Sequence, residues 1–96
     1  MQLQEAKKIL NLHRSDLAKL GVLTLALFGS VARNEGKAGS DVDILVDFDA
    51  KKGFFVFVDL KNYLETILKC EVDLVTKNAL HPALKKKILQ EAKHVF

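Results

Sequence analysis

Two aspartates, Asp41 and Asp43, have the type and spacing of metal-binding side chains. They open an apolar segment that is typical of a β-strand, where side chains two residues apart point to the same face with Cα atoms about 6.5–7 Å apart. Carboxylates bind Mg²⁺ through oxygen, and substrate phosphates and water complete its coordination. Two such ions, about 3.5–4 Å apart, can stabilise both the attacking and the leaving oxygen of a nucleotidyl transfer. We therefore predict that Asp41 and Asp43 ligate two Mg²⁺ ions.

A second chemical element, Gly29-Ser30, precedes Asp41 by a spacer of ten residues. Glycine lets backbone N–H groups approach a phosphate closely, and serine adds a hydroxyl donor. The residues that follow, VARNE, are compatible with a short helix whose first N–H groups could point at an anion. Arg33 lies in this segment, where it could meet a triphosphate, whereas a solvated loop position is preferred for Lys37. This spacing predicts a phosphate-binding element beside a metal-binding one.

A third carboxylate, Asp73, lies in the alternating segment Cys70–Thr76, which is typical of a strand. The roughly thirty residues between Asp43 and Asp73 are enough for a helical crossover between parallel neighbours. Asp73 would then stand beside the aspartate pair. Glu71 lies on the same face and is the less favoured alternative.

These residues together resemble the signature of the DNA polymerase β-like nucleotidyltransferase superfamily. The chain is most similar to its minimal single-domain branch, the antitoxins that are paired with HEPN-domain toxins. The resemblance is dense over Phe28 to Val46 and looser over most of the chain. The motif positions that carry it are Gly29, Ser30, Ala32, Arg33, Glu35 and the run Ser40-Asp41-Val42-Asp43-Ile44-Leu45-Val46.

The resemblance implies an α/β (α+β) nucleotidyltransferase fold, in which a small mixed sheet is flanked by helices. It implies transfer of AMP from ATP to a hydroxyl, by resemblance a tyrosine, of a partner HEPN RNase toxin, which is thereby silenced. Asp41, Asp43 and Asp73 would be the catalytic and metal-binding residues, and Asp73 would also help to deprotonate the attacking hydroxyl. Gly29, Ser30 and Arg33 would bind ATP. A hetero-oligomer with the toxin is a further expectation.

Three other interpretations stay open. The chain could be a binding-only antitoxin that blocks its toxin sterically, or it could transfer nucleotides to RNA or a small molecule with a separate binding subunit. The least favoured alternative gives the acidic strand no ligand, because charge alone can keep an exposed strand soluble. Replacing Asp43 by Asn would separate the first alternative from an enzyme, because only an enzyme would lose neutralisation.

The hydrophobic pattern identifies the elements that must position these residues. Apolar residues at helical spacing predict helices over residues 2–19, over 51–69 and near the end of the chain. Apolar runs predict strands over 22–28, 41–49 and 70–76. One face of the second strand is expected in the core: Val42, Ile44, Val46 and Phe48.

Both later helices carry long apolar stripes. In the helix over 51–69 the stripe comprises Phe54, Phe57, Leu60, Leu64, Ile67 and Leu68, and it is widened by Phe55, Val56 and Val58. The excess could cover a nucleotide base or a partner protein, but a core position is preferred in so small a domain. In the last helix Leu84, Ile88 and Ala92 form a stripe, and Lys85, Lys86 and Lys87 are expected on a solvated face.

Composition sets the remaining limits. Ninety-six residues fit one domain, here a single minimal nucleotidyltransferase domain over 1–96. A net charge of +3 is too mild to indicate a dedicated nucleic-acid binder, so direct nucleic-acid binding is not expected. One cysteine excludes an internal disulfide and a multi-cysteine zinc site. The sequence has no apolar run near the length of a membrane span and no signal-peptide layout, so a cytoplasmic location without membrane partners is expected.

Overall fold

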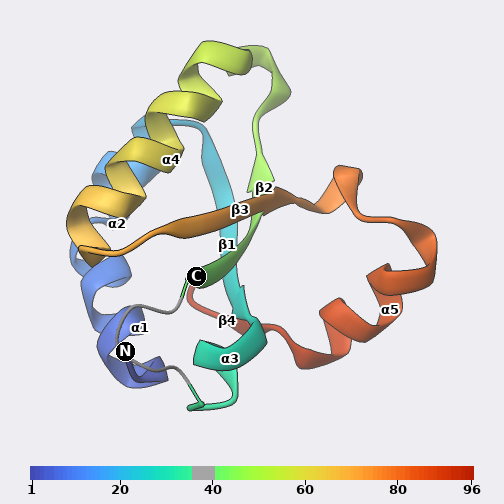
Figure 1. Ribbon diagram of the computed structural model, residues 1–96. Coiled ribbons are helices and arrows are strands. Elements are labelled where there is room, and N and C mark those ends of the chain that lie inside the picture. Colours follow the sequence, from blue (N-terminus) through green and yellow to red (C-terminus); the bar gives the residue numbers. More distant parts are fainter. Residues whose placement is uncertain (36–40) are drawn as a thin grey trace.

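A four-stranded mixed sheet forms the centre of the computed structural model, which describes residues 1–35 and 41–96 (Figure 1). The strand order is β3-β2-β1-β4, where β2 runs antiparallel to β1 and parallel to β3, and β4 runs antiparallel to β1. The strands are β1 (Val22–Phe28), β2 (Val42–Phe48), β3 (Val72–Thr76) and β4 (Lys93–His94). This architecture confirms the predicted mixed sheet with flanking helices, and β4 is a strand that the hydrophobic pattern did not predict.

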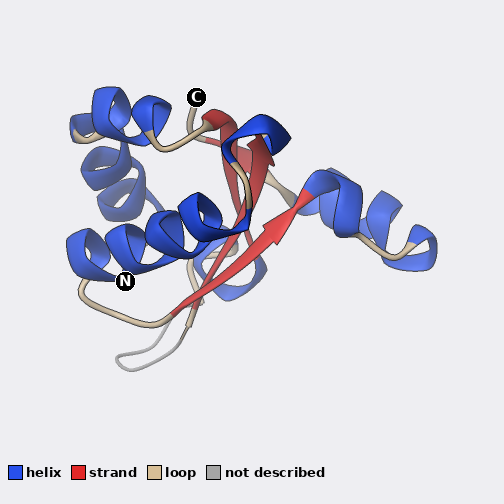
Figure 2. Ribbon diagram, turned by 90° about the horizontal axis from the view of Figure 1, so that it is seen from above, coloured by secondary structure: helices blue, strands red, loops and turns tan. Residues whose placement is uncertain are grey.

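The helices are α1 (Leu3–Leu12), α2 (Arg14–Lys19), α3 (Gly29–Ala32), α4 (Phe54–Leu68) and α5 (Pro82–Glu91), with short 3₁₀ turns η1 (Ala50–Lys52) and η2 (Lys77–Ala79). Helices α1, α2 and α4 cover one face of the sheet, and α5 lies apart from them on its other side (Figure 2). The main core joins α1, α2 and α4 to the covered face of the sheet. Strand β2 supplies Val42, Ile44 and Val46 to this core, and all three are fully buried, as the alternation predicts. Phe48 of the same strand packs against the edge of the core.

The first helix is broken at His13, contrary to the prediction of one helix over 2–19. The His13 backbone turns out of the helical region at ψ 15°, and its N–H bonds to the Leu10 carbonyl rather than one residue further back. The Ile9 carbonyl, which a continuous helix would pair with that N–H, instead lies 2.9 Å from the His13 ring nitrogen Nδ1. A side chain thus replaces a backbone donor at this turn, and α2 begins there.

None of the excess apolar residues of α4 (Phe55, Val56 and Val58) is buried, so the preferred core position was wrong, and Phe54 of the predicted stripe is exposed as well. Phe54 and Phe55, in the first turn of α4, are 72% and 82% exposed. Leu60, Leu64 and Leu68 of the same helix are buried as predicted. Helix α5 buries none of its residues, and Leu84 is 54% exposed.

The loop predicted between Asn34 and Ser40 falls largely outside the described residues, as do Lys37 and Ser40. Within residues 1–35 and 41–96, no helix is long and apolar enough to cross a membrane.

Candidate active site

The parallel pairing of β2 with β3 places two of the predicted carboxylates side by side. Asp43 is the register partner of Asp73. The ladder is secured just before this pair, since the Val42 N–H donates to the Glu71 carbonyl oxygen at 3.0 Å. The Val72 N–H donates to a carboxylate oxygen of Glu65 on α4, also at 3.0 Å. The crossover helix therefore holds the start of the strand that carries Asp73.

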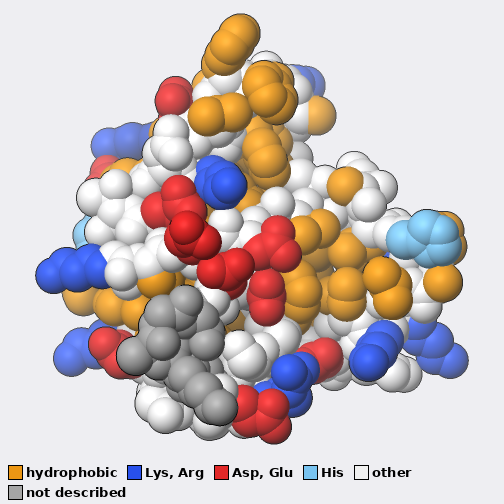
Figure 3. Space-filling model, viewed as in Figure 1, with side chains coloured by type: hydrophobic (Ala, Val, Ile, Leu, Met, Phe, Trp, Pro, Cys, Tyr) orange, Lys and Arg blue, Asp and Glu red, His pale blue; other side chains and the backbone are white. Residues whose placement is uncertain are grey.

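Asp41 lies one residue before β2 and is exposed, whereas Asp43 is half-buried within the strand. Acidic side chains gather near the centre of the face that shows β2 and β3 (Figure 3). Burial raises the pKa of the Asp43 carboxyl above its ordinary value, and the negative charges of Asp73 and Asp41 raise it further. Arg33 partly opposes this shift. The site thus brings negative charges close together, and a bound cation would reduce the repulsion between them.

Gly29 brings the end of β1 into contact with this carboxylate. It follows Phe28, the register partner of Asp43, and adopts φ +70°, a conformation that favours glycine. A Cβ atom added to Gly29 would lie 2.0 Å from Oδ2 of Asp43 and 3.0 Å from its Cγ. Any side chain here would force the Asp43 carboxylate or the backbone to move. The expected phosphate-binding residue and the expected metal ligand are therefore packed against each other.

Helix α3, which begins at Gly29, is a single turn that includes Ser30. The Glu35 N–H donates to the Ser30 carbonyl at 2.8 Å, and Asn34 adopts φ +58° as the turn ends. The Asn34 side-chain oxygen then accepts from the Leu3 N–H at 2.9 Å. This hydrogen bond ties the segment after the glycine to the beginning of α1.

Arg33 lies just beyond α3, near enough for its charge to act on Asp43, and its side chain is 48% exposed. Its guanidinium is held by two carboxylates: Nε lies 3.0 Å from Glu35, and Nη1 pairs with Glu91 at the end of α5. The prediction placed Arg33 near a triphosphate but did not include Glu91. Glu91 lies 58 residues away in sequence. The one sequence signal for it is a carboxylate in the last turn of a helix, where a negative charge is unfavourable.

The carboxylates suit Mg²⁺ better than a metal that needs a closed set of protein ligands. Among the described residues, no group of three His, Cys, Asp or Glu side chains is assembled to hold a metal ion. Mg²⁺ does not require one, because it usually takes one or two carboxylates and completes its shell with water and substrate phosphates. Asp43 supplies a half-buried carboxylate with neighbouring negative charge. The donor set therefore fits a Mg²⁺ that arrives with a nucleotide.

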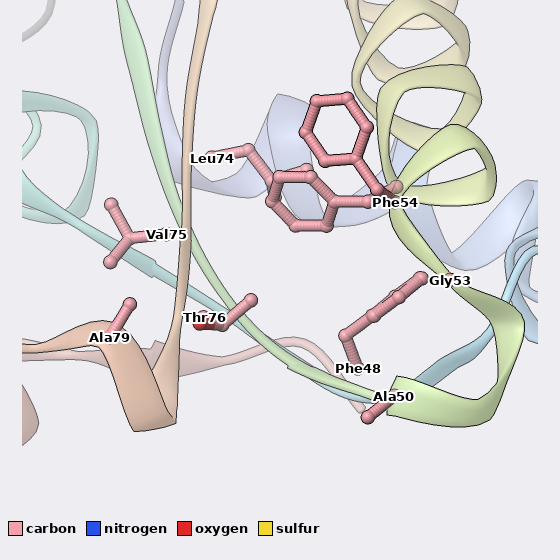
Figure 4. A pocket seen from close by; sticks show the side chains of 9 residues that line it. Phe48, Ala50, Gly53, Phe54, Leu74, Val75, Thr76 and Ala79 are labelled. Atoms are coloured by element: carbon pink, nitrogen blue, oxygen red, sulfur yellow. The ribbon is translucent and has the colours of Figure 1, made fainter.

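An apolar pocket of about 450 Å³ lies toward the other ends of β2 and β3 (Figure 4). Phe48 and Val75 line it from the two strands, and Phe54 and Phe57 line it from α4. None of the three predicted carboxylates is among its lining residues. The pocket is thus distinct from the charged site.

Comparison with known proteins gives a consistent family. The family model described as "Nucleotidyltransferase domain" matches residues 7–95. A Thermococcus cleftensis protein named protein adenylyltransferase MntA is 41% identical over 96 residues, covering 99% of this chain and 97% of that one. A Methanocaldococcus jannaschii protein assigned as a protein adenylyltransferase is 51% identical over 80 residues, covering 83% of this chain and 86% of that one.

Solved structures agree with this fold. One assigned as a minimal nucleotidyltransferase superposes with a TM-score of 0.77 at 34% identity, covering 97% of this chain and 95% of that one. A toxin–antitoxin crystal structure with AMP-PNP superposes with a TM-score of 0.72 at 25% identity, covering 95% of this chain and 72% of that one. The fold also matches a chain of the solved complex of a tri-AMPylated Shewanella oneidensis HEPN toxin with an MNT antitoxin, with a TM-score of 0.60 at 22% identity, covering 90% of this chain and 71% of that one.

Proposed function

The chain belongs to the nucleotidyltransferase domain family, and from this premise we propose that it transfers AMP from ATP to a hydroxyl of a partner HEPN toxin. The name of the Thermococcus relative supports a protein acceptor and AMP as the transferred group. The Shewanella complex, whose HEPN toxin carries AMP, supports this class of partner, and the AMP-PNP complex supports ATP as the donor. The transferred AMP would silence the toxin.

Gly29 and Ser30 would hold the terminal phosphates of ATP, and Arg33 would add a positive charge. A glycine at φ +70° lets the backbone approach a phosphate without a side chain in the way. The Ser30 hydroxyl is a further donor, and a guanidinium recognises phosphate through paired N–H groups. These residues come from one short segment, 29–33, so a single turn of chain would orient the triphosphate.

Asp41, Asp43 and Asp73 would hold two Mg²⁺ ions. When bound, these ions would neutralise charge on the triphosphate and on the oxygens of the transfer reaction. Burial and, after it, the negative charges of Asp73 and Asp41 raise the pKa of the Asp43 carboxyl, and a bound cation would reduce the repulsion among these charges, which supports this role.

In the transfer itself, the acceptor hydroxyl oxygen forms a bond to the α-phosphorus of ATP. The bond from that phosphorus to the oxygen bridging to the β-phosphate breaks, and pyrophosphate leaves. Asp73 would take the hydroxyl proton, and its exposed position beside Asp43 on the edge strand β3 supports this role. Most of the remaining catalysis is positioning and charge compensation, as in other phosphoryl transfers.

The observation that carries the proposal is the contact of Gly29 with the Asp43 carboxylate, which is itself paired with Asp73. Asp43 thus lies between Gly29, just after β1, and Asp73, near the start of β3. If the acidic residues served only to keep the strand soluble, nothing would require a glycine in contact with one of their carboxylates.

Intact mass spectrometry of the partner tests the proposal. The product of the neighbouring gene, which the proposal expects to be a HEPN protein, is incubated with this chain, ATP and Mg²⁺, and parallel reactions contain EDTA or the Asp43→Asn variant. We expect mass gains in whole AMP units that are absent from both controls. A stable complex without any mass gain would instead establish a binding-only antitoxin. Neither a gain nor a complex would direct the search to RNA or small-molecule acceptors.

A further inference from the structure

Arg33 takes part in both ion pairs found among residues 1–35 and 41–96. The chain contains 15 Lys and Arg and 12 Asp and Glu residues. Within the part of the chain that the structure describes, ion pairs closer than 4.0 Å occur only at Arg33, with Glu35 and Glu91. Glu35 is a near neighbour in sequence, but Glu91 comes from the far end of the chain. The pair with Glu91 therefore links α5 to the segment that begins at Gly29.

Glu91 is an unfavourable residue for its own helix. It is the last residue of α5, where the unpaired carbonyl groups make the helix end negative and disfavour a carboxylate. Its side chain is only 22% exposed, so it is also largely withdrawn from water. Lysine or arginine is the residue type that stabilises such a position. The local stability of α5 therefore gives no reason for a glutamate here, whereas contact with Arg33 does.

Helix α5 gains little stability from burial of its own residues. It buries none of its residues, and its neighbours in space include α3. The chain then continues from α5 into β4, which pairs with β1 through Ala26 and Leu27. These strand contacts fix the position of Glu91 relative to the end of β1, and hence relative to Gly29.

We propose that Glu91 is a positioning residue that holds the Arg33 guanidinium in place for the triphosphate of ATP. This inference rests on the proposed function, because it requires that Arg33 contacts the nucleotide. A guanidinium has five N–H donors, and the bonds to Glu35 and Glu91 engage Nε and Nη1. A phosphate can therefore bind while both carboxylates remain. A long, half-exposed side chain that is already held loses less conformational freedom on binding.

The test is a double-mutant cycle on Arg33 and Glu91, with KM for ATP and kcat measured in AMP transfer to the HEPN partner. We expect Glu91→Gln to raise KM for ATP about fivefold or more, which is the lower range of coupling between sites, and to change kcat less than twofold. In an Arg33→Gln background the same change should have no further effect, because Glu91 acts only through Arg33. Glu5→Gln, which removes an exposed charge on α1, is the matched control and should leave KM unchanged.

Binding of AMP-PNP with Mg²⁺ gives a second readout, which should weaken by the same factor in Glu91→Gln. Thermal unfolding of each variant identifies any general loss of structure, which would lower kcat in both backgrounds. An unchanged or lowered KM in Glu91→Gln would overturn the inference, and a lowered KM would mean that Glu91 competes with the nucleotide. If Arg33→Gln leaves KM unchanged, the assigned role of Arg33 fails. If the wild-type chain transfers no AMP, the proposed function fails instead.

Discussion

Replacing Gly29 by alanine should disrupt the site more than any other single added methyl group. A non-glycine residue at φ +70° costs about 1–2 kcal/mol. The new Cβ would also lie 2.0 Å from Oδ2 of Asp43, so either the carboxylate or the backbone must move. Overpacking of this kind typically costs about a further 1–3 kcal/mol. We expect Gly29→Ala to lower the free energy of unfolding by about 2–5 kcal/mol.

Gly53→Ala is the matched control. Gly53 also has a positive φ, of +84°, but a Cβ added there would meet nothing within 4 Å. Its ψ of 173° places it in a region that is open almost only to glycine, so Gly53→Ala should cost about 1–3 kcal/mol without any steric contact. A cost at Gly29 beyond this value is therefore due to the contact with Asp43. Urea unfolding of both variants gives the two free energies.

A third variant assigns that excess to the carboxylate. Asp43→Ala removes the two atoms that lie 2.0 and 3.0 Å from the added Cβ. In this background Gly29→Ala should cost only its backbone penalty, about 1–2 kcal/mol. AMP transfer by Gly29→Ala alone should fall by about 10²-fold, since displacing a reacting group by about 1 Å costs that much. An equal loss of stability from Gly29→Ala in the wild-type and Asp43→Ala backgrounds would refute this reasoning.

Three further predictions concern charge, a hydrogen bond and the exposed aromatic residues. Because the pKa of Asp43 is raised in the folded state, its ionised form destabilises the fold above the ordinary pKa of a carboxyl, about 4. In EDTA at pH 7, Asp43→Asn should therefore melt at a higher temperature than the wild type, and the gap should close as the pH falls toward 4; a lower Tm would contradict this. Glu65→Ala removes the acceptor of the Val72 N–H and should cost about 1–3 kcal/mol in urea unfolding, whereas Glu65→Gln, which keeps an acceptor oxygen, should cost clearly less. Phe55→Ser should change the free energy of unfolding by no more than about 0.5 kcal/mol, against about 2–5 kcal/mol for Leu64→Ala at a fully buried position; a large loss in Phe55→Ser would mean that Phe55 is a core residue after all.

The adjacency of Asp43 and Asp73 could be predicted because it follows from general topology. Two strands joined by a helix of suitable length become parallel neighbours, and alternation decides which residues share a face. The core face of β2 follows from the same alternation. Neither inference needs the exact position of any other element.

Other features depend on contacts that the local pattern does not contain. The approach of Gly29 to Asp43 is set by the antiparallel register of β1 and β2, and Glu91 meets Arg33 from 58 residues away. At His13 a ring nitrogen replaces a backbone donor, which helical periodicity cannot register. Hydrophobicity alone also cannot distinguish an apolar surface such as Phe54 and Phe55 from a core.

The position of β3 at the border of the sheet divides the site into two parts of unequal rigidity. Asp43 belongs to the inner strand β2 and Gly29 follows the inner strand β1, so unpairing either strand would break two ladders. Asp73 belongs to β3, which is paired through β2 alone, and opening an outer strand requires less free energy than unfolding the whole domain. Amide exchange should therefore be faster in β3 than in β2. The part of the site that would bind the nucleotide lies on inner strands and should open rarely. The part that would receive the acceptor hydroxyl lies on an outer strand and can move when a protein surface binds.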